Sequence, residues 1–186
     1  MSLAFESLAI PDVKLLVSSR IEDSRGFFSE IHRRDVFEAA GMFLEFVQDN
    51  LSMSIEAGTI RGLHFQTQPF AQAKLIRVIR GRVFDVAVDL RASSPTYGTH
   101  VSVELSAAGC RQLLVPVGFA HGFCTLEPNT ELEYKVTNYY APEHDRGLLW
   151  NDPDLKIDWP LHGLSPHLSD RDRQHPRLKD LVGSFA

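Results

Sequence analysis

Alternating apolar and polar residues mark most of this chain as short strands. In residues 83–90, Asp85 and Asp89 lie opposite a face of Phe, Val and Leu side chains, the two-residue period of a strand. Residues 101–106 and 131–140 alternate in the same way. Turn-forming residues separate these runs. Short alternating strands with regular turns predict an all-β sandwich or barrel.

Helical signals are few and short. The segment Arg34–Ala40 predicts one short helix, with Gly41 just after its C-terminus. A second helix is expected to begin at Ser169. Asp172 follows it by three residues, which is the spacing of a capping box. These helices are too short to change the predicted all-β class.

The size and composition of the chain suit one globular domain, residues 1–186. It has 44% hydrophobic and 23% charged residues, which is enough for a core without disulfides. From about residue 150 to 186 the chain is rich in Pro, His and charge. This segment is expected to be an arm packed over the barrel.

The sequence points to a cytoplasmic protein without a membrane partner. The N-terminus lacks a basic segment, and no apolar run approaches the ~18 residues of a membrane span. Cys110 and Cys124 are expected to be buried free thiols in a reducing compartment. The net charge of -5 leaves no basic excess for phosphates, so no nucleic-acid partner is expected. A small anionic ligand remains possible, because a few Arg and Lys can converge locally.

The side chains best suited to chemistry gather on or beside predicted strands. If they pointed inward, the barrel would have a polar interior, which a purely structural barrel avoids because buried unpaired charges are costly. These residues are Arg61, His64, Lys74, Asp85 and His121.

One geometric condition applies to the first two of them. Arg61 and His64 are three residues apart, so a flat strand would send them to opposite faces. A bend or bulge at Gly62 would allow both to face one cavity.

A metal site is a weaker interpretation of the same residues. The pattern Pro-x-Gly-x-x-His ending at His121 is half of the motif of metal-binding cupin barrels. The other half needs two His one residue apart and a Glu, but Gln66 stands in the second His position. Only His64 and His121 can be named, whereas a metal site needs at least three good ligands. No metal is expected, and a metal-dependent cupin oxygenase stays an alternative.

Acid–base chemistry fits these residues better. A His, with a pKa near 6.5, can accept a proton at neutral pH, and a Tyr, with a pKa near 10, can donate one. Tyr134 shares its strand face with Leu132 and Val136, so its ring should point inward. From pattern alone, the alternatives are a hydrogen-bonded core His64, a core Tyr134 and a solvated Lys74.

Seven segments, in order, span roughly Ile10 to Leu178 and carry a family resemblance. They make the chain resemble the dTDP-4-dehydrorhamnose 3,5-epimerase family. That resemblance implies a double-stranded β-helix, or cupin-like jelly roll, acting as a homodimer without metal or cofactor. The segments are Asp23–Phe28, Phe46–Asn50, Ile60–Gln66, Gly81–Asp89, Pro116–Phe123, Tyr134–Tyr140 and Leu149–Pro153.

The resemblance also implies an activity and roles for individual residues. The substrate would be a dTDP-4-keto-6-deoxyhexose, epimerised at C3 and C5 in dTDP-L-rhamnose biosynthesis. His64 would be the base, paired with Asp172, and Tyr134 the acid, while Lys74 would stabilise the enolate. The positions matching contacts to the nucleotide-sugar are Arg25, Glu30, Gln48, Asp49, Asn50, Arg61, His121, Tyr140, Asp145 and Arg171.

Two departures and two other functions qualify this resemblance. Asp145 stands where many relatives carry Glu, and Arg171 where some carry Lys, which affects the exact contacts more than the chemistry. An epimerase acting at C3 or C5 only would show the same acid, base and cation. A non-catalytic sugar-nucleotide-binding barrel would be expected to lack His64, Tyr134 or Lys74, and all three are present.

Overall fold

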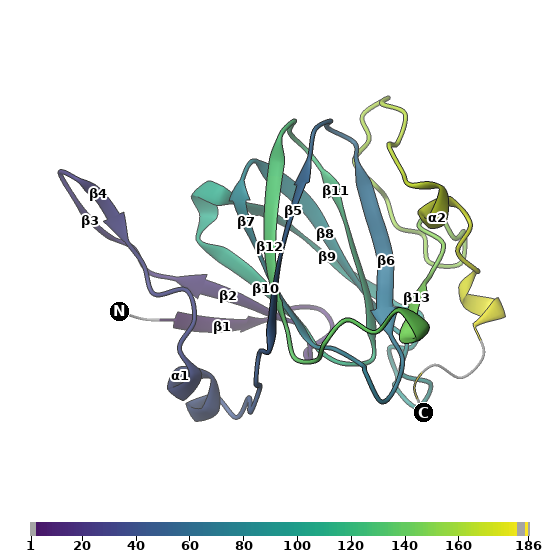
Figure 1. The fold of residues 1–186 in the computed structure, drawn as a ribbon, viewed down its shortest axis with the longest axis horizontal. Helices are drawn as coiled ribbons and strands as arrows, with labels where there is room; N and C mark the ends of the chain where they lie inside the picture. The colour runs from purple at the N-terminus through teal and green to yellow at the C-terminus, as the bar shows by residue number, and fades with distance from the viewer. Residues whose placement is uncertain (1–2, 182–184, 186) are drawn as a thin grey trace.

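Two antiparallel β-sheets face each other in the computed structural model, which describes residues 3–181 and 185 (Figure 1). The predicted all-β, jelly-roll architecture is confirmed. The six-stranded sheet runs in the order β1 (Leu3–Ser7), β2 (Lys14–Ser18), β10 (Arg111–Val115), β7 (Lys74–Arg80), β12 (Thr130–Val136) and β5 (Gln48–Ser54). The five-stranded sheet runs in the order β13 (Asp145–Gly147), β6 (Ile60–Gln66), β11 (Phe119–Thr125), β8 (Arg82–Asp89) and β9 (His100–Ser106).

A separate hairpin projects from the body of the molecule. It consists of β3 (Ile21–Asp23) and β4 (Gly26–Phe28), which pair only with each other (Figure 1). All six of their residues are exposed, including the large apolar side chains of Ile21, Phe27 and Phe28. The hairpin therefore contributes little to the core of its own chain.

The main core fills the space between the two sheets. Leu15, Ile76 and Leu132 of the six-stranded sheet pack there with Val83 and Phe123 of the five-stranded sheet. Side chains on alternate positions of the strands point into this core, and their neighbours point outward. Burial of apolar surface here supplies much of the force that holds the sheets together.

Both outer faces of the sandwich are also partly covered. Leu155, Trp159 and Phe185 pack on the outer face of the five-stranded sheet, against Val86 and Val88. Strand β8 is therefore buried on both sides, which explains its nearly continuous run of apolar residues. Side chains of the C-terminal segment thus cover this sheet. A third cluster forms where the helix α1 covers the six-stranded sheet with Phe37.

The short helices begin and end close to where the sequence predicts them. α1 spans Arg34–Ala39, and Gly41 follows with the positive φ of 80° that favours glycine. α2 spans Asp170–Arg173, and Ser169 caps it by accepting the N–H of Asp172 at 3.1 Å. The remaining helical turns are 3₁₀: η1 (Ala107–Gly109), η2 (Pro142–His144) and η3 (Leu178–Asp180).

Two expectations differ from the structure. The strand predicted over 131–140 ends at Val136, because Asn138 Oδ1 accepts the N–H of Tyr139 at 2.9 Å and competes with the sheet ladder. Of the two cysteines, Cys124 is buried, but Cys110 is only half-buried. Cys110 follows η1 in a left-handed conformation and accepts a bond from Arg20 Nε at 2.6 Å.

No helix among residues 3–181 has both the length and the apolar character needed to span a bilayer.

Candidate active site

A cavity of about 460 Å³ opens between the sheets, which is a volume typical of small-ligand sites. Its polar lining comes from three parts of the fold that are distant in sequence. A smaller neighbouring cavity of about 320 Å³ shares His64, Lys74 and Tyr134 with it. The two are adjoining parts of one cleft. The larger part is lined by Arg61, His64 and His121 from one sheet, Lys74 and Tyr134 from the other, and Arg171 and Asp172 from α2.

Gly62 provides the bend that the sequence required. The pairing of β6 with β11 shifts register between His121 and Phe123, next to Gly62, whose φ is 135°. A Cβ at position 62 would lie 2.5 Å from Gly122 Cα, a distance that real Cβ atoms do not tolerate. Only glycine fits there, and Arg61 and His64 both line the cavity as a result.

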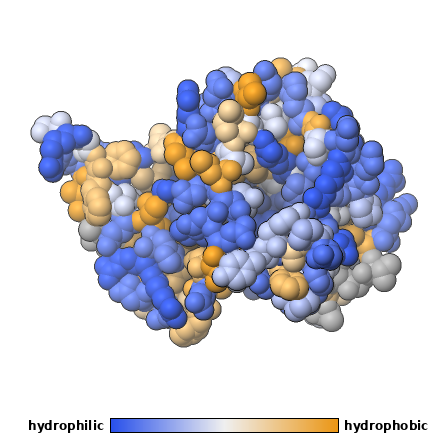
Figure 2. Space-filling model, in the orientation of Figure 1, coloured by the Kyte–Doolittle hydropathy of each residue, from blue (hydrophilic) through white to orange (hydrophobic). Residues whose placement is uncertain are grey.

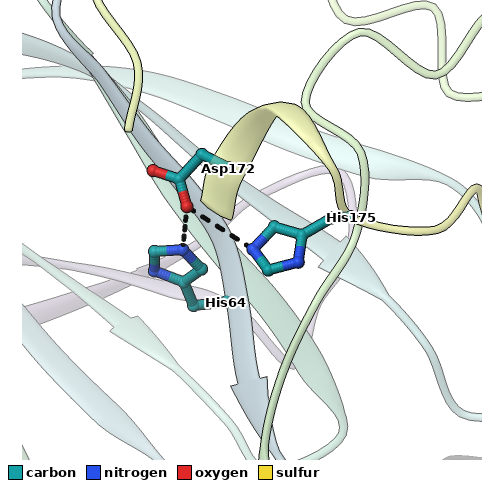
Figure 3. A group of neighbouring side chains, drawn as sticks. All are labelled: His64, Asp172 and His175. Carbon is teal, nitrogen blue, oxygen red and sulfur yellow. Dashed lines mark hydrogen bonds and ion pairs between the residues drawn. The ribbon is translucent and has the colours of Figure 1, made fainter. Parts of the chain in front are cut away.

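His64 and Asp172, which both line the cavity, form a close pair (Figure 3). The His64 Nε2 atom lies 2.6 Å from Asp172 Oδ1. Burial raises the pKa of Asp172, but the neighbouring imidazoles of His175 and His64 outweigh this effect and hold that pKa well below its usual range. Because Asp172 is ionised, His64 Nε2 carries the proton and donates it. The second ring nitrogen, Nδ1, keeps its lone pair.

The same surroundings keep His64 neutral. Burial lowers the pKa of His64 below its ordinary value of 6.5, although the bond to Asp172 opposes this effect. The positive charge of Lys74 lowers it further. An uncharged imidazole at neutral pH is the form that can accept a proton.

Lys74 and Tyr134 approach this imidazole from the opposite sheet. Lys74 Nζ donates to the backbone carbonyl oxygen of His64 at 3.1 Å. Burial lowers the pKa of Lys74 to about 8, which still leaves it mainly charged at pH 7. Burial raises the pKa of the Tyr134 phenol, so this group keeps its proton. The cleft thus holds a neutral base, a protonated acid and a cation.

Two further polar groups line the cleft. His121 Nε2 lies 2.8 Å from Asp85 Oδ1, and both residues are buried. At the other end, Arg171 pairs with Asp145 at 2.7 Å, and the Tyr140 hydroxyl donates to the same carboxylate at 3.0 Å. The carboxylates fix the orientation of the imidazole, the guanidinium and the phenol around the space where a ligand would lie.

The family comparison decides what kind of cavity this is. A family profile described as dTDP-4-dehydrorhamnose 3,5-epimerase matches residues 7–180. The chain belongs to the dTDP-4-dehydrorhamnose 3,5-epimerase family. Members of this family are isomerases of dTDP-L-rhamnose biosynthesis, so the predicted family and enzyme class are confirmed.

Individual relatives agree over nearly the whole chain. An epimerase of this name from Sinorhizobium fredii is 51% identical, over 97% of this chain and 92% of its own. The crystal structure of the Bacillus anthracis epimerase, with TDP and PPi bound, is 52% identical with a TM-score of 0.91, covering 95% of this chain and 99% of its own. The Legionella pneumophila epimerase in complex with dTDP-4-keto-L-rhamnose is 41% identical with a TM-score of 0.93, covering 98% and 96%.

Most residues that the epimerase resemblance selected lie around this cleft. Gln48, Asn50, Tyr140 and Asp145 line its smaller part. The larger part is lined by Arg61, His64, Lys74, His121, Tyr134, Arg171 and Asp172. Asp49 lies on the opposite face of β5, where it pairs with Lys135 at 2.9 Å. The alternation along β5 explains this difference, since Asp49 stands between two residues that point inward.

Two other selected residues also lie away from the cleft of their own chain. Arg25 sits at the exposed tip of the β3–β4 hairpin, paired with Asp23 at 2.6 Å. Glu30 follows the hairpin and lies 3.5 Å from Arg33. Neither lines either part of the epimerase cleft.

The sequence did not single out His175, which the structure brings into the epimerase site. Its Nε2 atom lies 3.4 Å from Asp172 Oδ1, on the carboxylate that pairs with His64 (Figure 3). The available signal was its place three residues after Asp172, on the same side of a helical turn. Among the described residues, the ligand atoms of His64, Asp172 and His175 lie within 4.8 Å of one another. The sequence named His64 and His121 as the possible ligands, and His121 is not part of this group.

Proposed function

We propose that this chain epimerises a dTDP-4-keto-6-deoxyhexose at C3 and C5 through an enolate. The observation that carries the proposal is the shared cavity: His64 comes from one sheet, and Tyr134 and Lys74 come from the other. A flat sugar ring between the sheets would have the base on one face and the acid on the other. Proton removal from one face and delivery to the opposite face inverts a carbon centre.

The chemistry follows from the charge states of these groups. The C4 ketone acidifies the hydrogens at C3 and C5, and His64 Nδ1 removes one of them. The electron pair moves into the ketone, and the Lys74 ammonium stabilises the resulting enolate oxygen. Tyr134 then protonates the carbon from the other face. Solvent exchange then removes the proton from His64 and returns one to the Tyr134 phenolate, and a second round at the other carbon completes the reaction. Hydrogen leaves and returns as a proton, so no redox cofactor is required.

Asp172 supports the base without touching the sugar. Its ionised carboxylate accepts the Nε2 proton of His64 at 2.6 Å, which fixes the tautomer and stabilises the imidazolium formed after proton removal. We assign the remaining cleft residues to binding of the nucleotide-sugar. Arg61 and Arg171 suit diphosphate oxygens because guanidinium groups bind them with two hydrogen bonds. The other binding positions are Gln48, Asn50, His121, Tyr140 and Asp145.

The test is solvent-deuterium exchange with dTDP-4-keto-6-deoxyglucose in heavy water. Two ring deuterons and an inverted product at both carbons support the proposal, as resolved by NMR. One deuteron would identify an epimerase of a single carbon, and no exchange would indicate a binding protein. His64→Ala should abolish exchange at both carbons. Retained exchange would mean that a different base acts.

We further propose that the enzyme is a homodimer. Strand β5 is an edge of the six-stranded sheet and exposes Leu51 and Met53, and Ile55 follows directly after it; each is at least half exposed. Figure 2 shows apolar patches over this part of the surface. An exposed apolar edge strand favours pairing with another chain, and a second copy is the commonest partner. Leu51→Glu is expected to produce monomers in analytical ultracentrifugation.

A dimer would give Arg25, Glu30 and the hairpin a place to bind. We propose that Arg25 and Glu30 complete the cleft of the partner subunit, because neither lines the cleft of its own chain. Mixing the inactive variants His64→Ala and Arg25→Ala tests this. A hybrid dimer would contain one cleft with an intact His64 and the partner's intact Arg25, so activity would return. If Arg25 acted within its own chain, both clefts of the hybrid would remain defective.

The proposed enzyme acts as one domain, residues 1–186, in the cytoplasm. The free thiols of Cys110 and Cys124 support that location, because reducing compartments preserve unpaired cysteines.

A further inference from the structure

The proposed epimerase mechanism leaves His175 without a role. Its side chain is only 9% exposed, and its Nε2 atom has no hydrogen-bond partner in the described part of the chain. The atom lies 3.4 Å from Asp172 Oδ1, outside hydrogen-bond geometry. Buried polar atoms are normally satisfied, and an unsatisfied one is commonly explained by an ion or water.

The position of His175 is built into the fold. Gly147 of β13 pairs with His64 of β6, and a Cβ at Gly147 would overlap the His175 ring. The missing side chain at Gly147 therefore creates the space in which His175 lies next to His64. The two rings are 5.5 Å apart and nearly perpendicular, at 80°.

Both imidazoles converge on a single carboxylate oxygen (Figure 3). His64 Nε2 lies 2.6 Å from Asp172 Oδ1, and His175 Nε2 lies 3.4 Å from the same atom. With bonds of about 2.0–2.2 Å, a tetrahedral zinc ion places its ligand atoms about 3.3 Å apart. All three atoms already lie within 4.8 Å of one another, so small side-chain rotations reach this geometry.

We propose that His64, Asp172 and His175 form an inhibitory site for Zn²⁺ or a similar divalent transition-metal ion. Two imidazoles and one carboxylate suit such ions, whereas Mg²⁺ and Ca²⁺ require mostly oxygen ligands. The nearby charges of Lys74 and Arg171 oppose the ion, so binding is weaker than at a structural zinc site and reversible.

Metal binding would switch off the base by changing its tautomer. In the free enzyme His64 Nε2 carries the proton and Nδ1 has the lone pair. When the metal–Nε2 bond forms, that proton moves through solvent to Nδ1, and the metal loses one water ligand. Nδ1 then has no lone pair for the substrate. The inhibition, though not the binding, rests on the epimerase function proposed above.

The experiment measures metal binding and activity separately. The EDTA-treated full chain is titrated with Zn²⁺ in a calorimeter, and with Co²⁺, whose visible absorption is intense only in four- or five-coordinate sites. We expect one ion per chain and loss of deuterium exchange with the same midpoint. Added EDTA should restore the rate, and Mg²⁺ should have no effect.

Variants of His175 identify the site. His175→Ala and the bulkier His175→Gln should each weaken Zn²⁺ binding by about 100-fold or more, because loss even of a group that only hydrogen-bonds to a metal ligand lowers metal affinity 10–100-fold. Circular dichroism checks that each variant is folded. Inhibition is scored against each variant's own metal-free rate. The exposed His162, replaced by Ala, is the matched control and should bind Zn²⁺ like the original chain.

Several results would overturn the proposal. Unchanged Zn²⁺ affinity in both His175 variants would do so, as would stoichiometric binding without inhibition or a weak octahedral Co²⁺ spectrum. If the chain bound Zn²⁺ at this site but exchanged no deuterium without metal, the proposed epimerase function would fail and the metal site would stand. Normal exchange without metal binding would reject only this site.

Discussion

The charge on Lys74 should set the alkaline limit of activity. Its ammonium is proposed to stabilise the enolate, so only molecules with a protonated Lys74 can react quickly. Burial lowers its pKa to about 8 from the ordinary value of 10.5. We expect kcat/KM to fall to about one half at pH 8 and about one tenth at pH 9. Below pH 6.5 the rate should fall as His64 gains a proton.

Tyr134 and Arg171 keep their protons through this pH range. Burial raises the pKa of Tyr134 above its ordinary value of 10, and the carboxylate of Asp145 raises the pKa of Arg171. Lys74→Arg keeps a charge that persists above pH 12, so the alkaline limb should move upward by two pH units or more. Lys74→Met removes the charge and should lower kcat/KM about 100-fold at pH 7, by analogy with loss of one oxyanion donor.

The assay is solvent-deuterium exchange followed by NMR between pH 5 and pH 11, with EDTA present. The variants are compared by the pH at which the rate falls on the alkaline side, not by the absolute rate, because the guanidinium of Lys74→Arg places its charge differently. If that variant is too slow, NMR titration of ¹³C-methylated lysines reports the Lys74 pKa directly. An alkaline limb near pH 10 in the original chain, or an unmoved limb in Lys74→Arg, would refute the reasoning.

Three further predictions concern the dyad and the framework around it. Asp172→Asn removes the charge that orients His64 and should lower kcat by about 10²–10⁴-fold with a smaller change in KM, measured by steady-state kinetics. Gly62→Ala should lower the free energy of unfolding in urea by about 3 kcal/mol or more, because the added Cβ would lie 2.5 Å from Gly122 Cα. The control Gly26→Ala, at a similar φ but with open space around the Cβ, should lower it clearly less. Asp89 is buried and ion-paired to Arg91 at 2.7 Å; burial raises its pKa, but the bonds from Arg91 and its neighbours hold it well below the usual range. Asp89 therefore contributes stability above about pH 4 that is lost as pH falls further. Thermal melts of Asp89→Asn at pH 7 should show a free energy of unfolding lower by about 3 kcal/mol, and the variant's stability should depend less on acid.

Local patterns predicted the fold well because they act over short distances. Alternation identified β8 and β9 within one residue of their observed ends, and Gly41 fixed the end of α1. The strand through Tyr140 was overextended, since the side chain of Asn138 competes with the ladder in a way that alternation does not reveal. The half-exposed Cys110 was missed because its environment depends on Arg20, ninety residues away.

The candidate site was predicted less completely, for reasons that differ between residues. Asp49 could have been separated from Gln48 and Asn50 by parity alone. His175 could not, because its place beside His64 depends on the missing side chain of Gly147. Arg25 was selected by resemblance, and one chain by itself does not bring it to the cleft.

The long sequence separation within the dyad has a consequence for protein synthesis. His64 precedes its carboxylate partner by 108 residues, and both sheets are translated before α2 emerges. A nascent chain that has already formed its barrel still lacks an oriented base and cannot turn over the sugar-nucleotides around it. Catalytic competence is therefore coupled to docking of a late segment, and a translation product stalled before that segment would lack the carboxylate that orients its base.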